Sequence, residues 1–297
     1  MKVSLICTVL NEETSTKPFL DSLLSQSRLP DEIVMVDGGS TDGTVEVIKS
    51  YVADDVPIRL AIAEGANISQ GRNIAIGSTT CDYIAATDAG VRLDKHWLKI
   101  LIEGFEMDRR AEVVVGFYLP EPRTTYEEYV CQLLYPEAEW VDLDKFFPSS
   151  RSIAFHKECW EKVGGYPEWL YTGEDGLFAV RMREAGCKFV FAKDAIAYWR
   201  PRRNLRALFR QYYLYAKGSA QAGTAGLGAR YNVGTLRRIF THRVPLFFRK
   251  NLLQGGKISS LWYGPLILLT SISGVAIGTL AGKFAGKDER SLKDSIV

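Results

Sequence analysis

The stretch DEIVMVDGGSTDGT, residues 31–44, gives the clearest sign of how this chain folds, because an apolar run rich in β-branched residues ends abruptly at an acid and two glycines. Such a run indicates a buried strand, and the glycines allow a tight turn after it. Ser40, Thr41 or Asp42 can cap a helix that begins near Thr44. The stretch therefore predicts a strand, a turn and a helix, the unit from which parallel sheets are built.

Similar apolar runs recur up to about residue 200. They are VSLICTV (3–9), IRLAIA (58–63), DYIAATD (82–88) and AEVVVGFYL (111–119). Between them, apolar residues recur at helical spacing in segments 19–24 and 97–105. This alternation predicts an α/β fold, an open and mainly parallel twisted sheet with helices on both faces.

Acids and other polar residues follow these strands directly. Asn11, Glu12 and Glu13 follow the first strand, Asp37 ends the second, and Asp88 ends the fourth. Ligands of open α/β sheets bind beyond the carboxyl ends of the strands, so these positions are candidate ligand contacts. An ordinary turn with a good helix cap accounts for the Asp37 loop equally well.

Three charged residues on predicted helices are further candidates. Arg72 can meet a diphosphate with both arms of its guanidinium, or can simply pair with Glu64 at the surface. Glu174 and Asp175 begin a helix, where the helix dipole favours acids without any catalytic role. The same pair can also provide a general base, which needs one carboxylate free to accept a hydroxyl proton.

Composition excludes several classes of protein. Among 297 residues, 37 Lys and Arg nearly balance 35 Asp and Glu, so the net charge of +2 argues against a nucleic-acid partner. The five cysteines contain no CxxC pair, which disfavours a zinc site or a disulfide framework. The chain also lacks GxGxxG after its first strand and any GxxxxGK[ST], which disfavours dinucleotide-binding and P-loop enzymes.

The C-terminal third has a different character. The segment 202–217 is basic and aromatic, which is typical of an interfacial amphipathic helix. No charged residue occurs from Ile258 to Gly282, and 25 helical residues at about 1.5 Å each are long enough to cross a bilayer core of roughly 30 Å. A membrane helix is expected here, with a buried core helix and a re-entrant hairpin as alternatives.

Six motifs in this order resemble the family 2 glycosyltransferases, which have the GT-A fold. The resemblance runs from Val3 to about Gly218. Its motifs are the Asn-Glu-Glu exit of the first strand, VDGGSTDGT (36–44), the Gly-Arg-Asn helix (71–73), the Asp88 loop, VGGYPE (163–168) and GEDGLFAVRMREAG (173–186). The resemblance implies a transferase that uses a nucleotide sugar and inverts the anomeric carbon in a single displacement.

The resemblance also implies roles for particular residues. Asp175 matches the catalytic base, with Glu174 beside it, and Asp88 matches the first acid of an Asp-x-Asp motif that contacts the ribose and helps to place Mg²⁺ or Mn²⁺. The implied donor-binding set comprises Thr8, Asn11, Glu12, Asp37, Gly39, Arg72 and Asp88.

The sequence departs from the family pattern at three places. Gly38 follows Asp37 where the family often has a second acid, so Glu12 is a candidate to supply that contact. Gly90 stands where the second acid of Asp-x-Asp, usually a metal ligand, is expected. Leu214-Tyr215 replaces Arg-Trp after Gln211, which argues against a processive polymer synthase.

The expected protein is therefore a glycosyltransferase that acts on a lipid-linked or membrane-proximal glycan, with the membrane itself as a partner. A catalytically silent module that binds a nucleotide sugar is the alternative, because the acid at Gly90 is lost. The expected parts are a catalytic domain (1–222), a basic and aromatic linker (223–257), a membrane helix (258–282) and a charged tail (283–297). The N-terminal apolar run is too short for a signal peptide, so we expect a single-pass or monotopic protein with a cytoplasmic catalytic domain.

Overall fold

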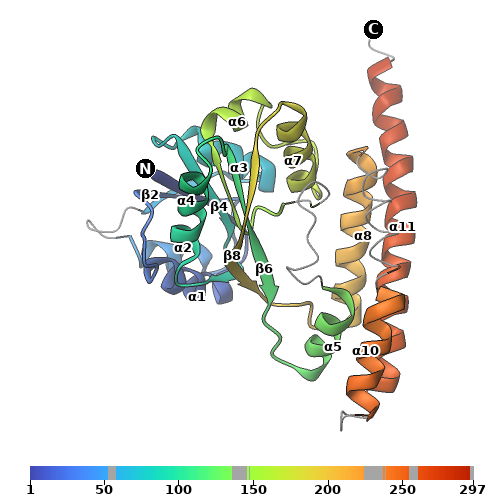
Figure 1. Ribbon diagram of the computed structural model, residues 1–297. Helices are drawn as coiled ribbons and strands as arrows, with labels where there is room; N and C mark the ends of the chain where they lie inside the picture. The colour runs from blue at the N-terminus through green and yellow to red at the C-terminus, as the bar shows by residue number, and fades with distance from the viewer. Residues whose placement is uncertain are drawn as a thin grey trace. The chain divides into compact units, whose positions relative to one another are not determined.

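A computed structural model describes residues 1–52, 58–135, 146, 148–223, 237, 239–253 and 260–294 of the chain. Its contacts divide the chain into two compact units. Unit 1 comprises Met1–Leu119 and Val141–Trp199, and unit 2 comprises Pro120–Trp140 and Arg200–Val297. Unit 1 contains the β-sheet, and unit 2 is built from helices (Figure 1).

Four parallel strands form one half of the eight-stranded sheet. They are β1 (Val3–Val9), β2 (Glu32–Asp37), β3 (Ile58–Ile62) and β4 (Tyr83–Asp88). Val9 pairs with Asp37 and Thr8 pairs with Asp88, so three strands end together at one edge. The four strands confirm the expectation from the apolar runs, and side chains on both faces of β1, β2 and β4 are buried, whereas β3 lies at the edge of the sheet and is partly exposed.

The other half of the sheet is mixed in direction. Here β7 (Ile153–His156) lies between β4 and β6 (Val113–Pro120) and is antiparallel to both. The full order is β3-β2-β1-β4-β7-β6-β8-β5, with β8 (Phe189–Trp199) and β5 (Val91–Leu93) at the far edge. In this half β6 is predicted by the apolar run 111–119, whereas β5 and β7, with three and four residues, are too short for a periodicity to show, and β8 is not predicted.

Helices cover both faces of this sheet (Figure 1). They are α1 (Glu13–Leu24), α2 (Thr44–Lys49), α3 (Ile68–Gly77), α4 (Trp97–Met107), α6 (Lys157–Lys162) and α7 (Glu174–Glu184). Helix α3 packs on β1 and β2. Gly71 makes this close approach possible, because a Cβ there would lie 2.8 Å from the Thr8 methyl carbon. The predicted α/β fold is thus confirmed, and α3 is held against the strands that end at the site.

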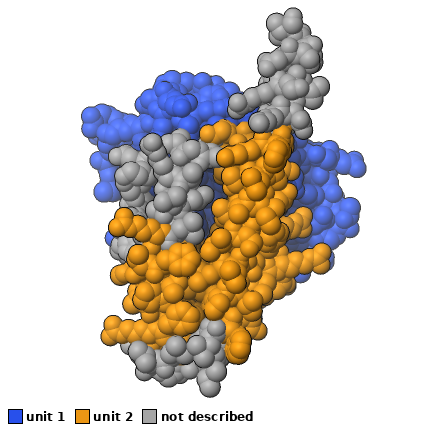
Figure 2. Space-filling model, turned by 90° about the vertical axis from the view of Figure 1, so that its right-hand side faces the viewer, with its two compact units in different colours: residues 1–119, 141–199 blue, residues 120–140, 200–297 orange. Residues whose placement is uncertain are grey.

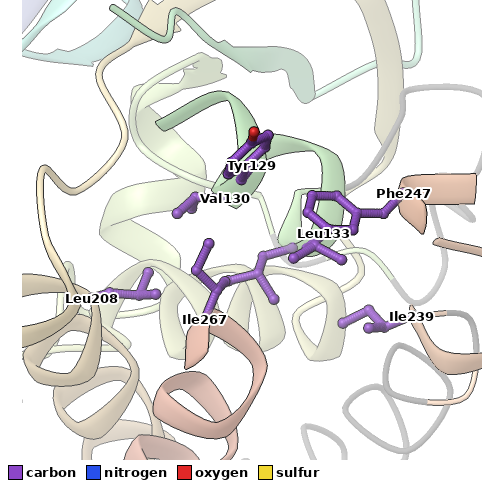
Figure 3. Packing of buried hydrophobic residues seen from close by; sticks show 8 residues of the cluster. Tyr129, Val130, Leu133, Leu208, Ile239, Phe247 and Ile267 are labelled. Atoms are coloured by element: carbon purple, nitrogen blue, oxygen red, sulfur yellow. The ribbon is translucent and has the colours of Figure 1, made fainter. Parts of the chain in front are cut away.

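Unit 2, orange in Figure 2, is a separate helical body. Its elements are α5 (Thr125–Leu134), α8 (Leu205–Gln221), η2 (Ile239–Arg243), α10 (Val244–Phe248), η3 (Arg249–Leu253) and α11 (Ser260–Asp294). Figure 3 shows its core, in which side chains from five of these helices meet. The core residues are Tyr129, Val130, Leu133, Leu134, Leu208, Ile239, Phe247 and Ile267.

A buried ion pair strengthens unit 2. Glu127 of α5 is fully buried, and its Oε1 accepts hydrogen bonds from Nε and Nη2 of Arg200 at 3.0 and 2.9 Å. Its Oε2 accepts from the backbone N–H of Arg123 at 2.6 Å. Because removal of one partner would leave a buried charge uncompensated, this pair fixes α5 to the segment that enters α8.

The units differ from the domains expected from the sequence. Helix α8 falls within the expected catalytic domain (1–222), yet it packs along α11 in unit 2, and α5 joins the same core. Helix α11 continues through the expected tail as far as Asp294. Within it, Trp262–Ala285 is long and apolar enough to cross a membrane, by length and composition. The described part of the expected linker is helical (η2, α10 and η3), and its remaining residues lie outside the described ranges.

Candidate active site

The loops after β1 and β2 are tied to each other. Asn11 has φ 55°, and it is the one non-glycine residue with positive φ in the described ranges. Its backbone N–H donates to Ser40 Oγ at 2.8 Å, and its Oδ1 accepts from the Thr41 N–H at 2.9 Å. An asparagine tolerates this left-handed backbone better than most residues. The site residue Asn11 therefore has a structural role here, since it holds the two loops together.

The buried carboxylate of Asp37 organises its own loop. Its Oδ1 accepts from the backbone N–H groups of Gly39 and Ser40, each at 2.8 Å, and its Oδ2 accepts from Ser40 Oγ at 2.5 Å. Gly39 has φ +96°, a conformation that favours glycine. In this conformation Asp37 shapes the turn, and its predicted contact with a nucleoside stays a prediction.

Glu12 lies at the start of α1 and faces the neighbouring Asp88 loop. Its backbone N–H donates to Thr44 Oγ1 at 2.8 Å, and its Oε2 accepts from Ser15 Oγ. Both carboxylate oxygens lie 3.9 Å from the position that a Cβ would take at Gly90. Glu12 thus brings an acid to the place where the second acid of the Asp-x-Asp motif would begin.

Arg72 is the centre of the predicted site. Its Nη1 donates to Glu174 Oε1 at 3.0 Å and to Asp175 Oδ1 at 2.8 Å, and its Nη2 donates to Asp88 Oδ1 at 2.9 Å. The side chain is only 1% exposed. Burial opposes its charged form, but the three acids raise the pKa of Arg72 well above its ordinary value. One buried guanidinium therefore holds three of the predicted site residues together.

Two carboxylates at the start of α7 have different surroundings. Asp175 is the more exposed, and its Oδ2 accepts from the Ser150 N–H at 3.1 Å and from Ser149 Oγ at 3.3 Å. Ser150 Oγ also donates to Asp175 Oδ1 at 2.6 Å. Glu174 is buried, and burial together with the charge of Asp175 raises the pKa of Glu174 to about 7, although Arg72 opposes the shift. Asp175 is therefore the carboxylate of this pair that an acceptor hydroxyl can reach more easily.

Four further residues of this site are not predicted from the sequence. Ser149 and Ser150 hold Asp175, and Arg151 Nε lies 3.5 Å from Asp88 Oδ2. Tyr166 lies under the Arg72 guanidinium, 5.2 Å from ring centre to carbon, and hydrogen-bonds Ser150 Oγ at 2.8 Å. Because β7 is antiparallel to β4, the residues just before β7 lie beside the end of β4. The polar run before β7 (149–152) is the signal that could have found Ser149, Ser150 and Arg151, once the direction of β7 is known, whereas Tyr166 belongs to the VGGYPE motif (163–168).

The acids at this edge can hold a divalent ion. Hard cations such as Mg²⁺ and Mn²⁺ take oxygen ligands, and Asp88 and Glu12 both supply carboxylate oxygens here. Both acids also raise the pKa of the thiol of Cys7, after burial as the main cause, so their charges act on the same buried point below the site. Among the described residues, one group of three, Glu112, Cys159 and Cys187, meets metal-ligand geometry, and it does not include Asp88.

Comparison with known proteins places the chain in a family. Residues 4–150 match Glycosyl transferase family 2. The chain is 24% identical over 225 residues to the O-antigen chain rhamnosyltransferase RfbN of Salmonella typhimurium. The aligned residues cover 72% of this chain and 71% of the relative.

Two solved structures share its fold. One is the mannosyltransferase PcManGT from Pyrobaculum calidifontis in complex with GDP-Man and Mn²⁺, with a TM-score of 0.60, 17% identity and coverage of 98% of this chain and 80% of that chain. The other is S. aureus TarS 1–349 in complex with UDP-GlcNAc, with a TM-score of 0.59, 15% identity and coverage of 98% and 92%.

The family match and the glycosyltransferases among its relatives show that the protein is a glycosyltransferase that depends on a nucleotide sugar. The chain belongs to the family 2 glycosyltransferases and has the GT-A fold. The family, the fold and the use of a nucleotide sugar, which the sequence motifs imply, are confirmed, and inversion at the anomeric carbon stays a prediction.

Proposed function

We propose that the protein transfers a sugar from a nucleotide-diphosphate donor to a hydroxyl of a lipid-linked or membrane-proximal glycan, with inversion at the anomeric carbon. The observation that carries this proposal is the Arg72 cluster, which joins Asp88 at the end of β4 to Asp175 at the start of α7. A single displacement needs a group near the leaving diphosphate and a base near the acceptor, in one rigid arrangement.

Asp175 is the proposed base. The bond between the acceptor oxygen and the anomeric carbon forms while the bond from that carbon to the diphosphate oxygen breaks, and the hydroxyl proton passes to Asp175. Hydrogen bonds from Ser149 and Ser150 fix the orientation of this carboxylate. Glu174, whose pKa is raised to about 7 by burial and by the charge of Asp175, holds its proton more readily than an ordinary carboxyl, which limits the negative charge at the start of α7.

Asp88 and Glu12 are the proposed ligands of Mg²⁺ or Mn²⁺. A divalent ion would neutralise charge on the departing nucleoside diphosphate. The Mn²⁺ in the similar mannosyltransferase structure supports this proposal. Arg151 is the cation with partial exposure beside Asp88, whereas Arg72 is almost fully buried. We therefore assign Arg72 to positioning the acids, and Arg151 to the diphosphate.

The donor site is proposed to lie beyond the ends of β1, β2 and β4. Thr8, Glu12 and Asp88 lie at this edge, and the loop held by Asn11 and Asp37 forms its wall, with Gly39 at the turn. The rhamnosyltransferase and mannosyltransferase among the similar proteins support a hexose donor. The apolar stretch Trp262–Ala285 supports attachment to a membrane and with it a membrane-bound acceptor. We also propose that the catalytic unit lies in the cytoplasm.

The test is sugar transfer by the full chain in detergent, with membrane lipid extract as acceptor source. A rhamnose donor, GDP-mannose and UDP-GlcNAc are compared with Mg²⁺, Mn²⁺ or EDTA. Asp175→Asn keeps the shape of the base and removes its basicity, and Glu184→Gln removes a charge from the exposed far end of the same helix. We expect metal-stimulated turnover of one donor, lost with Asp175→Asn and kept with Glu184→Gln.

Isothermal titration of the same donor separates binding from catalysis. The Asp175→Asn protein should bind the donor as the wild type does. Equal turnover by both proteins would remove Asp175 from the role of base. Donor binding without turnover by the wild type would favour a silent binding module instead.

A further inference from the structure

Helix α11 exposes large apolar side chains and buries mostly small residues. The positions buried against the rest of unit 2 are Gly264, Ile267, Ser271, Gly274, Gly278 and Gly282. The exposed positions carry large apolar side chains, among them Trp262 at 75%, Leu269 at 62% and Phe284 at 68% exposure. A helix on the surface of a water-soluble protein turns its large apolar residues inward. This helix instead has the pattern of helices that pack on a neighbour through small residues and face lipid with large ones.

Three of these glycines lock α11 onto α8. A Cβ at Gly274 would lie 2.9 Å from the carbonyl oxygen of Phe209. A Cβ at Gly278 would overlap the carbonyl of Tyr213, and a Cβ at Gly282 would overlap that of Lys217. The contacts advance by four residues in both helices, so the two helices run parallel and touch backbone to backbone. Helices α8 and α11 therefore bind a membrane together or not at all.

This pairing is hard to reconcile with a helix that crosses the bilayer alone. Helix α8 has 17 residues, about 25 Å, and carries Arg206, Arg210 and Lys217 along that length. Cations are costly in the hydrocarbon core. After α8 the chain also returns to the first part of α11, since Ile239 and Phe247 share a core with Ile267. A pair that lies at the membrane surface avoids both problems.

Charge is strongly divided along the chain. Between Asp194 and Asp288 the sequence has 15 Lys and Arg and no acid, whereas residues 1–194 have 32 acids and 20 Lys and Arg. Exposed cations of the described part include Arg206, Arg210, Arg249 and Lys250, and the exposed side chain of Leu246 lies on α10, directly before this last pair. The small net charge of the whole chain hides this division. A cationic segment next to an exposed apolar face complements an anionic bilayer surface.

We propose that unit 2 binds the surface of a bilayer that contains anionic lipid, with the outer face of α11 in one leaflet and the exposed cations Arg206, Arg210, Arg249 and Lys250 on the phosphate headgroups. Helices α8 and α11 enter as one body, and neither crosses the membrane. This deepens the proposed membrane attachment and does not rest on the transfer reaction, because lipid binding is measured without donor or acceptor.

The first experiment is flotation of the full chain with vesicles of phosphatidylcholine alone or mixed with phosphatidylglycerol. We expect binding to the mixed vesicles that weakens between ~0.1 and ~1 M NaCl, as the Debye length falls from about 10 to about 3 Å. At about a factor of five per cation near an anionic surface, Arg206→Gln with Arg210→Gln should weaken binding about 30-fold. Lys95→Gln with Lys99→Gln removes the same charge from unit 1 and should change nothing.

Leu269→Ser with Leu280→Ser tests the apolar face, and we expect binding to be lost while the helical circular dichroism is kept. Flotation that is equal on both vesicle types and insensitive to salt would overturn the role of anionic lipid. A different outcome would assign this face to a second copy of the chain and overturn the proposal. In that outcome the serine variant floats as the wild type does, the wild type is a dimer in detergent, and the serine variant is a monomer.

The second experiment is protease access to tags at both ends of the chain in sealed vesicles. Binding at the surface leaves both tags on the same side, so both are cleaved together. Cleavage of one tag with protection of the other would show that α11 spans the bilayer, and would overturn the proposal.

Discussion

Replacement of Glu174 by Gln tests the electrostatics of the Arg72 cluster. Burial and the charge of Asp175 raise the pKa of Glu174 from 4.5 to about 7. The folded protein therefore holds this proton more tightly than the unfolded chain does, so the stabilising proton is present below about pH 4.5 and is lost as the pH rises through 7. At 1.36 kcal/mol per pKa unit, the free energy of unfolding should fall by roughly 3 kcal/mol across this range.

The amide introduced by Glu174→Gln would mimic the protonated carboxyl, and its carbonyl oxygen can still accept from Arg72. The pH-dependent loss should then disappear, so urea unfolding at pH 5 and pH 8 should differ less in the variant than in the wild type by roughly 3 kcal/mol. Glu184→Gln, at the exposed end of the same helix, serves as the control and should leave the wild-type pH dependence intact. Parallel pH dependences of Glu174→Gln and wild type would refute the assignment of a raised pKa to this carboxyl.

Substitutions at three other positions probe the same physics. Arg72→Met should destabilise the protein by about 3–5 kcal/mol in urea unfolding, because three acids lose their shared cation, while Arg72→Lys should keep more stability and still lower kcat; equal stability of the Met variant and wild type would show that the cluster is not held by this charge. Gly90→Asp should tighten the binding of Mn²⁺, because its Cβ would lie 3.9 Å from both carboxylate oxygens of Glu12 and would add an oxygen ligand there. Titration with Mn²⁺ in the absence of donor measures this. Weaker binding by the variant would show that Glu12 and the new acid do not bind one ion together. Arg200→Met should lower the stability of unit 2 by about 3–5 kcal/mol, because the fully buried Glu127 loses its cation, and an unchanged thermal midpoint would contradict this.

The part of the fold that could be predicted from sequence is the part built from long apolar runs. Strands β1 to β4 and helices α3 and α7 follow from period, caps and turn residues, which are local signals. Strands β5 and β7 have three and four residues, too few for a period to show. The division into units also depends on contacts between α5 and α8, distant segments whose pairing leaves no local mark.

The candidate site divides in the same way. Asp88 and Asp175 can be identified because acids at a strand end and a helix start stand out in the sequence. The place of Arg72 could not be foreseen, because an arginine on a helix gives no sign that it will be buried among acids. Ser149 and Ser150 escape sequence reasoning because their position beside Asp175 depends on the antiparallel direction of β7.

The span of the Arg72 contacts along the chain also bears on the order of folding. Its partner Asp88 is 16 residues away, but Glu174 and Asp175 are 102 and 103 residues away. Contacts of such sequence separation are closed late, since the intervening chain must first be ordered. During synthesis, β1 to β4 can assemble with Arg72 beside Asp88 well before α7 leaves the ribosome. We therefore expect Asp175, the proposed base, to join the donor side late in folding, so that the proposed site is completed only when the fold of unit 1 is nearly complete.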